Sequence, residues 1–136
     1  VTLAIAQRLV GKLCNYCKHE VEVSPKVSQM IENNLARLSK EVLQEFNIQK
    51  PFKLWQSQGC PKCNNKRTKG RLAIFEMLRM TDELKHIILE QDASALAIEK
   101  EAVRQGMISM KQDGIMKALL GIVALEDVFR VVEEQI

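Results

Sequence analysis

All four cysteines of this 136-residue chain occur in two C-x-x-C pairs, Cys14 with Cys17 and Cys60 with Cys63. Each such turn can direct two thiolates at one point, and two turns can complete the tetrahedral coordination that zinc prefers. The pattern therefore predicts a structural Zn²⁺ site bound by these four cysteines. Because the thiols must stay reduced to bind metal, the pattern also indicates a reducing, cytosolic compartment.

The two pairs are separated by 42 residues, whereas a simple zinc ribbon has about 15–20. We expect a helix leading away from the first pair and a strand leading back to bring the second pair within reach. Four unmetallated thiols, two disulfide-forming pairs, an iron–sulfur cluster and another thiophilic metal are the alternatives. Redox chemistry is disfavoured because a redox C-x-x-C turn normally precedes a helix, while Cys14 follows a segment with helical spacing.

The elements expected around the cysteines are mostly helical. Apolar residues at three- and four-residue spacing predict a helix over residues 2–13. Ser24-Pro25 begins a long helix, with a capping hydroxyl and a proline at the first helical position, and its apolar stripe runs to Phe46. Strand-like composition and alternation predict short strands at 52–56 and 70–78.

After Thr81 the pattern changes to short helices joined by short loops. Thr81, Ser94 and Ser109 each stand where a residue that caps a helix N-terminus is expected. Helices are predicted at 82–91, 95–105, 110–120 and 125–135, which form a compact bundle. We therefore predict an α+β, mostly helical fold in three parts: a terminal helix at 1–13, a tetracysteine zinc module at 14–80 and a helical domain at 81–136.

The net charge of +3 conceals an uneven distribution. Residues 14–80 hold twelve Lys and Arg against six Glu, while residues 81–136 hold six against eleven Asp and Glu. Such a shift suggests two modules with different surfaces, and it lets the basic module dock on the acidic one. The densest basic run follows the second cysteine pair: Lys62, Lys66, Arg67, Lys69 and Arg71. This run suits nucleic acid or anionic lipid, but the lack of a nearby aromatic ladder favours a solvated loop or domain interface.

No complete active site is evident, so the chain by itself is not predicted to be an enzyme. Gly11-Lys12 does not form a phosphate loop, because Ala6 stands where the first glycine belongs and Leu13 where the hydroxyl belongs. His19 is expected beside the metal ligands or at the surface and not as a ligand, and His86 is expected at the surface. No apolar run approaches the ~18 residues of a membrane span.

Short motifs beside both cysteine pairs and along the C-terminal third of the chain form one combination. They comprise Ala6-Gln7-Arg8-Leu9-Val10 before Cys14, then Cys60-Pro61-Lys62-Cys63-Asn64 with Gly70-Arg71 and Ile74-Phe75-Glu76, and finally Gly106-Met107, Gln112-Asp113-Gly114, Lys117, Gly121-Ile122 and Leu125-Glu126-Asp127-Val128. This combination resembles the secretion ATPase family, the ATPases of type II secretion and type IV pilus assembly. The resemblance covers nearly the whole chain.

The resemblance implies a C-terminal fragment whose nucleotide-binding core, with its ATP and Mg²⁺, precedes Val1. In the family, a cytoplasmic homo-hexamer hydrolyses ATP and drives an inner-membrane assembly platform. By position, the family's zinc ligands correspond to the four cysteines of this chain: Cys14, Cys17, Cys60 and Cys63. The implied partners are the ATPase core of the same protein and the platform protein, with a location in the cytoplasm at the inner membrane and no nucleic acid bound.

Three positions depart from the family's pattern. Gly11 stands where arginine is common, Thr68 where an aromatic residue is common, and Ala124 where a threonine commonly caps the last helix. The third departure predicts a loss of roughly 1 kcal/mol in helix capping. Two rival functions remain open from the residues alone: a nucleic-acid-binding zinc module and a thiol redox protein.

Overall fold

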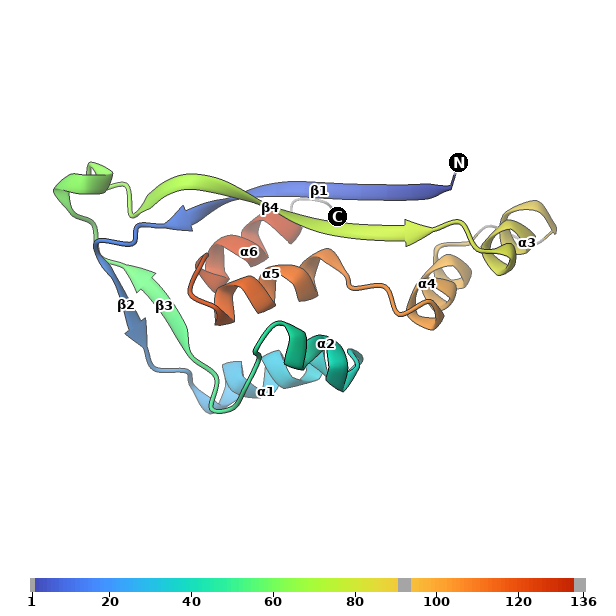
Figure 1. Ribbon diagram of the computed structural model, residues 1–136, viewed down its shortest axis with the longest axis horizontal. Helices are drawn as coiled ribbons and strands as arrows, with labels where there is room; N and C mark the ends of the chain where they lie inside the picture. The colour runs from blue at the N-terminus through green and yellow to red at the C-terminus, as the bar shows by residue number, and fades with distance from the viewer. Residues whose placement is uncertain (1, 91–93, 134–136) are drawn as a thin grey trace.

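The computed structural model describes residues 2–90 and 94–133 and shows two antiparallel ribbons accompanied by helices (Figure 1). The long ribbon pairs β1 (Leu3–Leu13) with β4 (Thr68–Arg79), and the short ribbon pairs β2 (Lys18–Val21) with β3 (Leu54–Ser57). The α-helices are α1 (Pro25–Leu35), α2 (Lys40–Glu45), α3 (Asp82–Glu90), α4 (Ala95–Arg104), α5 (Met110–Leu119) and α6 (Leu125–Glu133). A short 3-10 turn, η1 (Pro61–Cys63), precedes β4. The predicted α+β fold with a mostly helical content is confirmed.

The predicted helix at 2–13 is wrong, because these residues form strand β1. β1 pairs antiparallel with β4 from Leu3 opposite Arg79 to Leu13 opposite Thr68, with a register shift between Gly11 and Leu13. The apolar residues of this stretch fit a helical period and a strand about equally well over so short a window. The strand forms because it pairs with a segment more than fifty residues later in the chain. The periodicity of residues 2–13 alone carries no information about that partner.

The predicted long helix ending at Phe46 is also corrected, because the chain breaks between α1 and α2. The Ser39 hydroxyl accepts a hydrogen bond from the backbone N–H of Val42 and starts α2 as its N-cap. Serine favours this local bond over continuing the preceding helix. Ser24, which was predicted as an N-cap, does begin α1, where its hydroxyl accepts from the N–H of Val27 at 3.2 Å.

The C-terminal helices agree with prediction and begin at the expected caps. Thr81, Ser94 and Ser109 each accept a hydrogen bond from the N–H three residues later. Ser109 also forms a reciprocal capping box with Gln112 at the start of α5. The predicted helix ends at residues 91, 134 and 135 lie outside the described residues. Among the described residues, none of the helices has the length and apolar character needed to cross a membrane.

One hydrophobic core joins the two halves of the chain. α5 packs against β4, α6 packs against β1, and α5 and α6 pack against each other. The fully buried side chains come from residues both before and after Thr81: Val10, Ile31, Ile74, Ile115, Met116, Val123 and Val128. The helices nearest the C-terminus therefore stabilise the ribbon that carries the cysteines.

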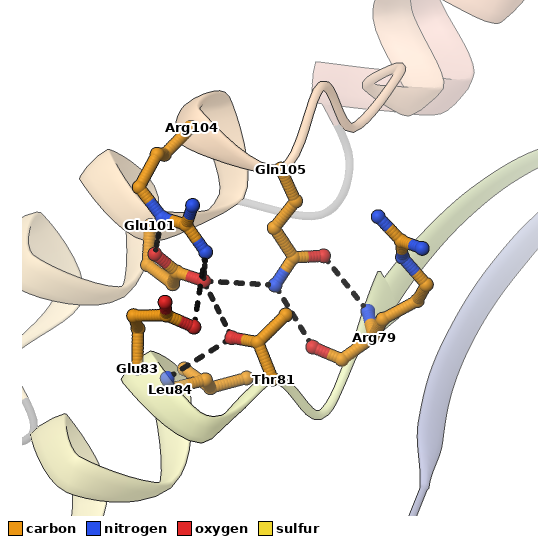
Figure 2. A network of polar contacts seen from close by, with 7 residues as sticks. All are labelled: Arg79, Thr81, Glu83, Leu84, Glu101, Arg104 and Gln105. Carbon is orange, nitrogen blue, oxygen red and sulfur yellow. Dashed lines mark hydrogen bonds and ion pairs between the residues drawn. The ribbon is translucent and has the colours of Figure 1, made fainter.

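The α3–α4 hairpin lies at the far end of β4 and is attached by a polar network (Figure 2). The buried Glu101 carboxylate accepts hydrogen bonds from the Thr81 hydroxyl at 2.5 Å and from the Arg104 guanidinium at 2.5 and 2.9 Å. The hydrogen bonds from Arg104 and Thr81 lower the pKa of Glu101 to about 2. The Gln105 amide bonds both the N–H and the C=O of Arg79, which fixes the hairpin to the end of β4.

Candidate metal centre

The four predicted cysteine ligands come together at the junction of the two ribbons. Cys14 follows β1, Cys17 precedes β2, and Cys60 and Cys63 lie between β3 and β4. Their Sγ atoms all lie within 4.8 Å of one another. The closest Sγ–Sγ distances are 3.7 Å for Cys14–Cys60, 3.8 Å for Cys60–Cys63 and 3.9 Å for Cys17–Cys63.

These distances distinguish between the alternatives for the cysteines. A disulfide requires about 2.05 Å between its sulfurs, and all four cysteines are free. A tetrahedral Zn²⁺ site with Zn–S bonds of about 2.3 Å places its sulfurs about 3.8 Å apart, because a tetrahedron's edge is about 1.63 times its centre-to-corner distance. The three closest distances agree with such a tetrahedron to within about 0.1 Å. The arrangement therefore suits one metal ion and not a pair of disulfides.

Each cysteine pair is shaped by a tight backbone turn. In the first, the N–H groups of Cys17 and Lys18 both donate to the carbonyl of Cys14, at 3.4 and 3.0 Å. In the second, Pro61 opens η1, and the N–H groups of Cys63 and Asn65 donate to the carbonyl of Cys60 at 3.3 and 3.0 Å. The chain leaves this turn through two asparagines, Asn64 and Asn65, with φ of 55° and 58°, a conformation that asparagine tolerates better than most residues.

The two turns are brought together by backbone pairing. The N–H of Cys14 donates to the carbonyl of Arg67 at 3.1 Å, directly beside the pair formed by Leu13 and Thr68. The β2–β3 ribbon starts at the same point, with Lys18 opposite Ser57. Both ribbons therefore diverge from the cysteine cluster, so a metal bound there would hold the ends of all four strands.

The thiols are held in a dry environment that affects them unequally. Cys14, Cys17 and Cys63 are buried, and Cys60 is partly buried. Burial, together with hydrogen bonds to neighbouring thiols, raises the pKa of Cys17 to about 11. At Cys63, burial is outweighed by hydrogen bonds with the backbone of Cys60 and Arg67, and the pKa falls to about 6. Four thiolates this close together would repel one another, so a cation among them is needed before all four can ionise.

Two lysines lie over the ring of Tyr16, which stands inside the first cysteine pair. The Lys62 and Lys69 ammonium groups lie 5.4 and 5.5 Å from the centre of the exposed Tyr16 ring. A Zn²⁺ ion with four thiolates carries a net charge of −2, which nearby lysines and arginines would offset. His19 is exposed on β2 and is not part of the metal-binding group, and His86 lies on α3, so neither histidine joins the cluster among the described residues.

Sequence reasoning missed a second set of contacts at the cluster, made by the turn between α5 and α6. The N–H of Leu13 donates to the carbonyl of Ile122 at 2.9 Å, and the Lys18 ammonium donates to the carbonyl of Gly121 at 2.8 Å. Trp55 lies against Gly121, where an added Cβ would be 3.1 Å from the indole ring. The only sequence signal was Gly121, which has the positive φ of 78° expected after a helix end.

Comparison with known proteins gives a consistent result. The family model for the "Type II/IV secretion system protein" matches residues 1–130. The "Type IV pilus assembly ATPase PilB" of Thermus thermophilus is 40% identical over 124 residues, which is 91% of this chain and 13% of that protein. PilB of Pseudomonas aeruginosa is 37% identical over 134 residues, 98% of this chain and 21% of the relative. The "Type II secretion system ATPase E" of Vibrio cholerae is 35% identical over 130 residues, 96% and 23% respectively. The chain thus spans less than a quarter of each of these relatives.

Proposed function

This chain belongs to the type II/IV secretion system protein family, and from that premise we propose that it is the zinc-stabilised C-terminal region of a secretion or pilus-assembly ATPase. The curated relatives are named as ATPases and are four to eight times longer than the stretch that they share with this chain. The proposal places ATP hydrolysis outside residues 1–136, because the chain contains no G-x-x-x-x-G-K-[ST] sequence. The chain's own part is then structural and mechanical.

The proposed cofactor is Zn²⁺, bound by Cys14, Cys17, Cys60 and Cys63. The observation that carries this assignment is the sulfur geometry: three Sγ–Sγ distances of 3.7–3.9 Å and all four sulfurs within 4.8 Å, which fits a tetrahedral Zn–thiolate site. When bound, the ion holds the thiolates and stabilises the fold, and no open coordination position remains for catalysis. Native mass spectrometry with elemental analysis tests this: we expect one zinc per chain, and iron or an unmetallated chain would contradict the assignment.

We propose that the metal centre couples the ATP-driven motor to an inner-membrane platform protein. β1 enters the cluster at Cys14, and the turn between α5 and α6 contacts the same point through Leu13 and Lys18. A displacement of β1 would therefore be passed to β2, β3 and the C-terminal helices as one body. The proposed parent is a cytoplasmic homo-hexamer at the inner membrane, and α1, α2 and the basic loop (residues 62–71) form its platform-facing surface.

A pull-down of the platform protein with the parent protein tests this surface. Replacing Lys62, Lys66 and Lys69 with Gln removes three exposed positive charges and leaves the cysteines in place. We expect weaker capture, and unchanged capture would remove the basic loop from the proposal. Lys85→Gln, Lys100→Gln and Lys111→Gln, three exposed lysines on α3, α4 and α5 outside the proposed surface, provide the control for a general loss of charge.

A nucleic-acid-binding zinc module is the alternative function, favoured by the same basic loop. Against it, the ring of Tyr16 is contacted by the ammonium groups of Lys62 and Lys69 and is not a free platform for a base. Binding to DNA or RNA that weakens steeply with salt would support the alternative, and no binding at ~50 mM salt would end it.

A further inference from the structure

A small pocket opens beside the short ribbon, at the end away from the cysteines. Its lining comes from the end of β2 and the start of β3, from the first two turns of α1 and from the start of α6. Figure 1 shows the chain passing from β2 into α1 at this end of the ribbon. The cavity measures about 280 Å³, below the usual size of a cofactor or small-molecule site, and it suits an inserted side chain better.

The lining of the pocket is largely apolar and is only partly covered by the chain itself. Leu54 and Leu125 are buried, whereas Met30, Trp55 and Phe129 are half-buried. Aromatic residues and methionine are enriched at the buried centres of protein–protein interfaces, where they form pockets for an anchor residue of the partner. Three such side chains around one open cavity therefore offer a place for an apolar anchor.

Two carboxylates give the pocket a negative rim. Glu22 and Glu126 both line the cavity and both are exposed. The Glu126 carboxylate accepts a hydrogen bond from the Gln56 amide at 3.0 Å, a neutral partner that leaves the negative charge in place. Among the described residues that line the cavity, none carries a positive charge. Lys111 lies over the Phe129 ring, 5.4 Å from its centre, but does not line the pocket.

The rim carboxylates differ from other acids on the same elements. Within residues 2–90 and 94–133, neither Glu22 nor Glu126 pairs with a lysine or arginine. Their neighbours on β2, α1 and α6 do form ion pairs: Glu20 with Lys53, Glu32 with Lys50, and Asp127 with Arg130. The negative potential is therefore concentrated beside the apolar pocket, where it would attract a cation from outside the chain.

We propose that this pocket binds a basic peptide segment through one large apolar side chain, with lysine or arginine residues of the segment beside Glu22 and Glu126. In the proposed assembly, the segment belongs to the cytoplasmic part of the inner-membrane platform protein, and this assignment rests on the proposed function. Cytoplasmic segments of membrane proteins carry an excess of lysine and arginine close to the membrane. Anionic lipid is disfavoured as the occupant, because the rim carboxylates would repel its headgroups.

The pocket and the basic loop attract opposite charges. The start of α1, which lines the pocket, belongs to the same proposed platform-facing surface as the loop. A partner that contacts both must present basic residues to the pocket and acidic residues to the loop. Charge complementarity of two signs fixes the orientation of a partner, which a uniformly basic surface would not do.

Peptide binding to the full-length protein tests the proposal. The probes are overlapping peptides of about 20 residues from the cytoplasmic segments of the platform protein, together with a helical Lys-Leu peptide and a matched Glu-Leu peptide. Fluorescence anisotropy of the labelled peptides gives their dissociation constants. We expect the Lys-Leu peptide and the basic platform peptides to bind, and a Glu-Leu peptide that binds as tightly would overturn the proposal.

Two substitutions at one position separate electrostatics from damage to the fold. Met30→Lys and Met30→Glu place opposite charges in the same wall of the pocket, so the loss of the apolar side chain is common to both. At ~50 mM salt we expect Met30→Lys to bind basic peptides at least about tenfold more weakly than Met30→Glu, with a smaller difference at high salt. Equal affinities of the two variants, each with one zinc bound, would contradict a binding site at this pocket.

Neutralising the rim provides a second comparison. Glu22→Gln with Glu126→Gln should weaken peptide binding by roughly fivefold, because each exposed ion pair contributes only a fraction of 1 kcal/mol. Glu99→Gln with Glu133→Gln removes two exposed carboxylates outside the pocket and should leave binding unchanged. An equal loss in both double variants would assign the effect to net charge and refute the pocket.

Capture of the platform protein distinguishes this inference from the proposed function. We expect Met30→Lys to reduce capture by the full-length protein and Met30→Glu to retain it. Unchanged capture by Met30→Lys would overturn the assignment of the segment to the platform protein. If the unsubstituted protein captures no platform protein while the Lys-Leu peptide binds with the expected dependence on residue 30, the proposed function fails and the basic-peptide site stands.

Discussion

Replacing Gly114 with alanine tests how α5 and α6 are held together behind the metal centre. A Cβ at this position would lie 2.4 Å from Cγ1 of Val128 and 3.2 Å from its Cγ2. Carbon atoms in contact prefer about 3.5–4.0 Å, so the two helices would have to separate by about 1 Å. Val128 is fully buried and has no solvent to rotate into.

The expected magnitude follows from two opposing effects. Overpacking a filled core costs about 1–3 kcal/mol, and the required shift places this site at the upper end. Alanine gains about 1 kcal/mol over glycine in a helix interior, which offsets part of that cost. We therefore expect Gly114→Ala to lower the free energy of unfolding of the metal-loaded protein by about 2 kcal/mol. Urea unfolding followed by the fluorescence of Trp55, the single tryptophan, measures the change.

A double-mutant cycle distinguishes this reasoning from a general effect of the substitution. Val128→Ala alone removes two buried methyl groups and should destabilise the protein, but it also clears the space that the new Cβ needs. Adding Gly114→Ala to Val128→Ala should then cost nothing or stabilise, giving a coupling of at least about 1 kcal/mol. Two results would refute this reasoning: a Gly114→Ala variant as stable as the unsubstituted protein, or effects of the two substitutions that simply add. Either would show that the close approach of α5 and α6 does not require glycine at this position.

Three further predictions concern the metal centre and the polar network. Chelating the metal should unfold the cysteine turns and the α5–α6 pair in one transition, because they share one core. Trp55 fluorescence and far-ultraviolet circular dichroism should report this transition together. Helices that stay intact after chelation would contradict the shared core. Lys18→Met, which removes the bond to Gly121, should cost about 0.5–1.5 kcal/mol in urea unfolding, while Lys26→Met on exposed α1 should cost nothing. The pKa of Glu101 is about 2, below the usual value of about 4.3. The ionised Glu101 carboxylate therefore contributes its full stabilisation of the folded state above the usual pKa, and this stabilisation is lost as the pH falls toward 2. The thermal unfolding midpoint should therefore depend less on pH in Glu101→Gln than in the unsubstituted protein between these two pH values. The same pH dependence in both proteins would refute a stabilising role for the Glu101 carboxylate.

The cysteine cluster was predictable because C-x-x-C spacing limits where thiols can point, whatever the surrounding elements are. Helix starts were predictable for a similar reason, since the bonds at Ser24, Ser94 and Ser109 are made within three residues. The break at Ser39 was missed although its capping bond is equally local, because the apolar stripe continues through it. The strands that were missed depend on distant partners. β1 is defined by β4, and the four-residue β2 is defined by β3, so neither carries a sufficient local signal.

The correction of β1 also changes one argument about the cysteines. Redox chemistry was disfavoured because Cys14 was expected to follow a helix, and Cys14 instead follows a strand. The case against redox chemistry now rests on the sulfur geometry, because all three close pairs are 3.7–3.9 Å apart and no single pair is singled out for a disulfide. A redox pair needs two sulfurs that approach each other preferentially, whereas a metal needs all four sulfurs around one point, as found here within 4.8 Å.

Two of the departures from the family's sequence pattern, Gly11 and Thr68, are neighbours in the structure. Gly11 and Thr68 lie against each other at the register shift of the long ribbon, where an added Cβ on residue 11 would be 2.9 Å from the Thr68 methyl group. A larger residue at position 11 would therefore require the Thr68 side chain to shift, so the two positions are in direct contact and are not independent. Gly11 is three residues before Cys14 and Thr68 pairs with Leu13, so the register shift sets where β1 places that cysteine relative to Arg67.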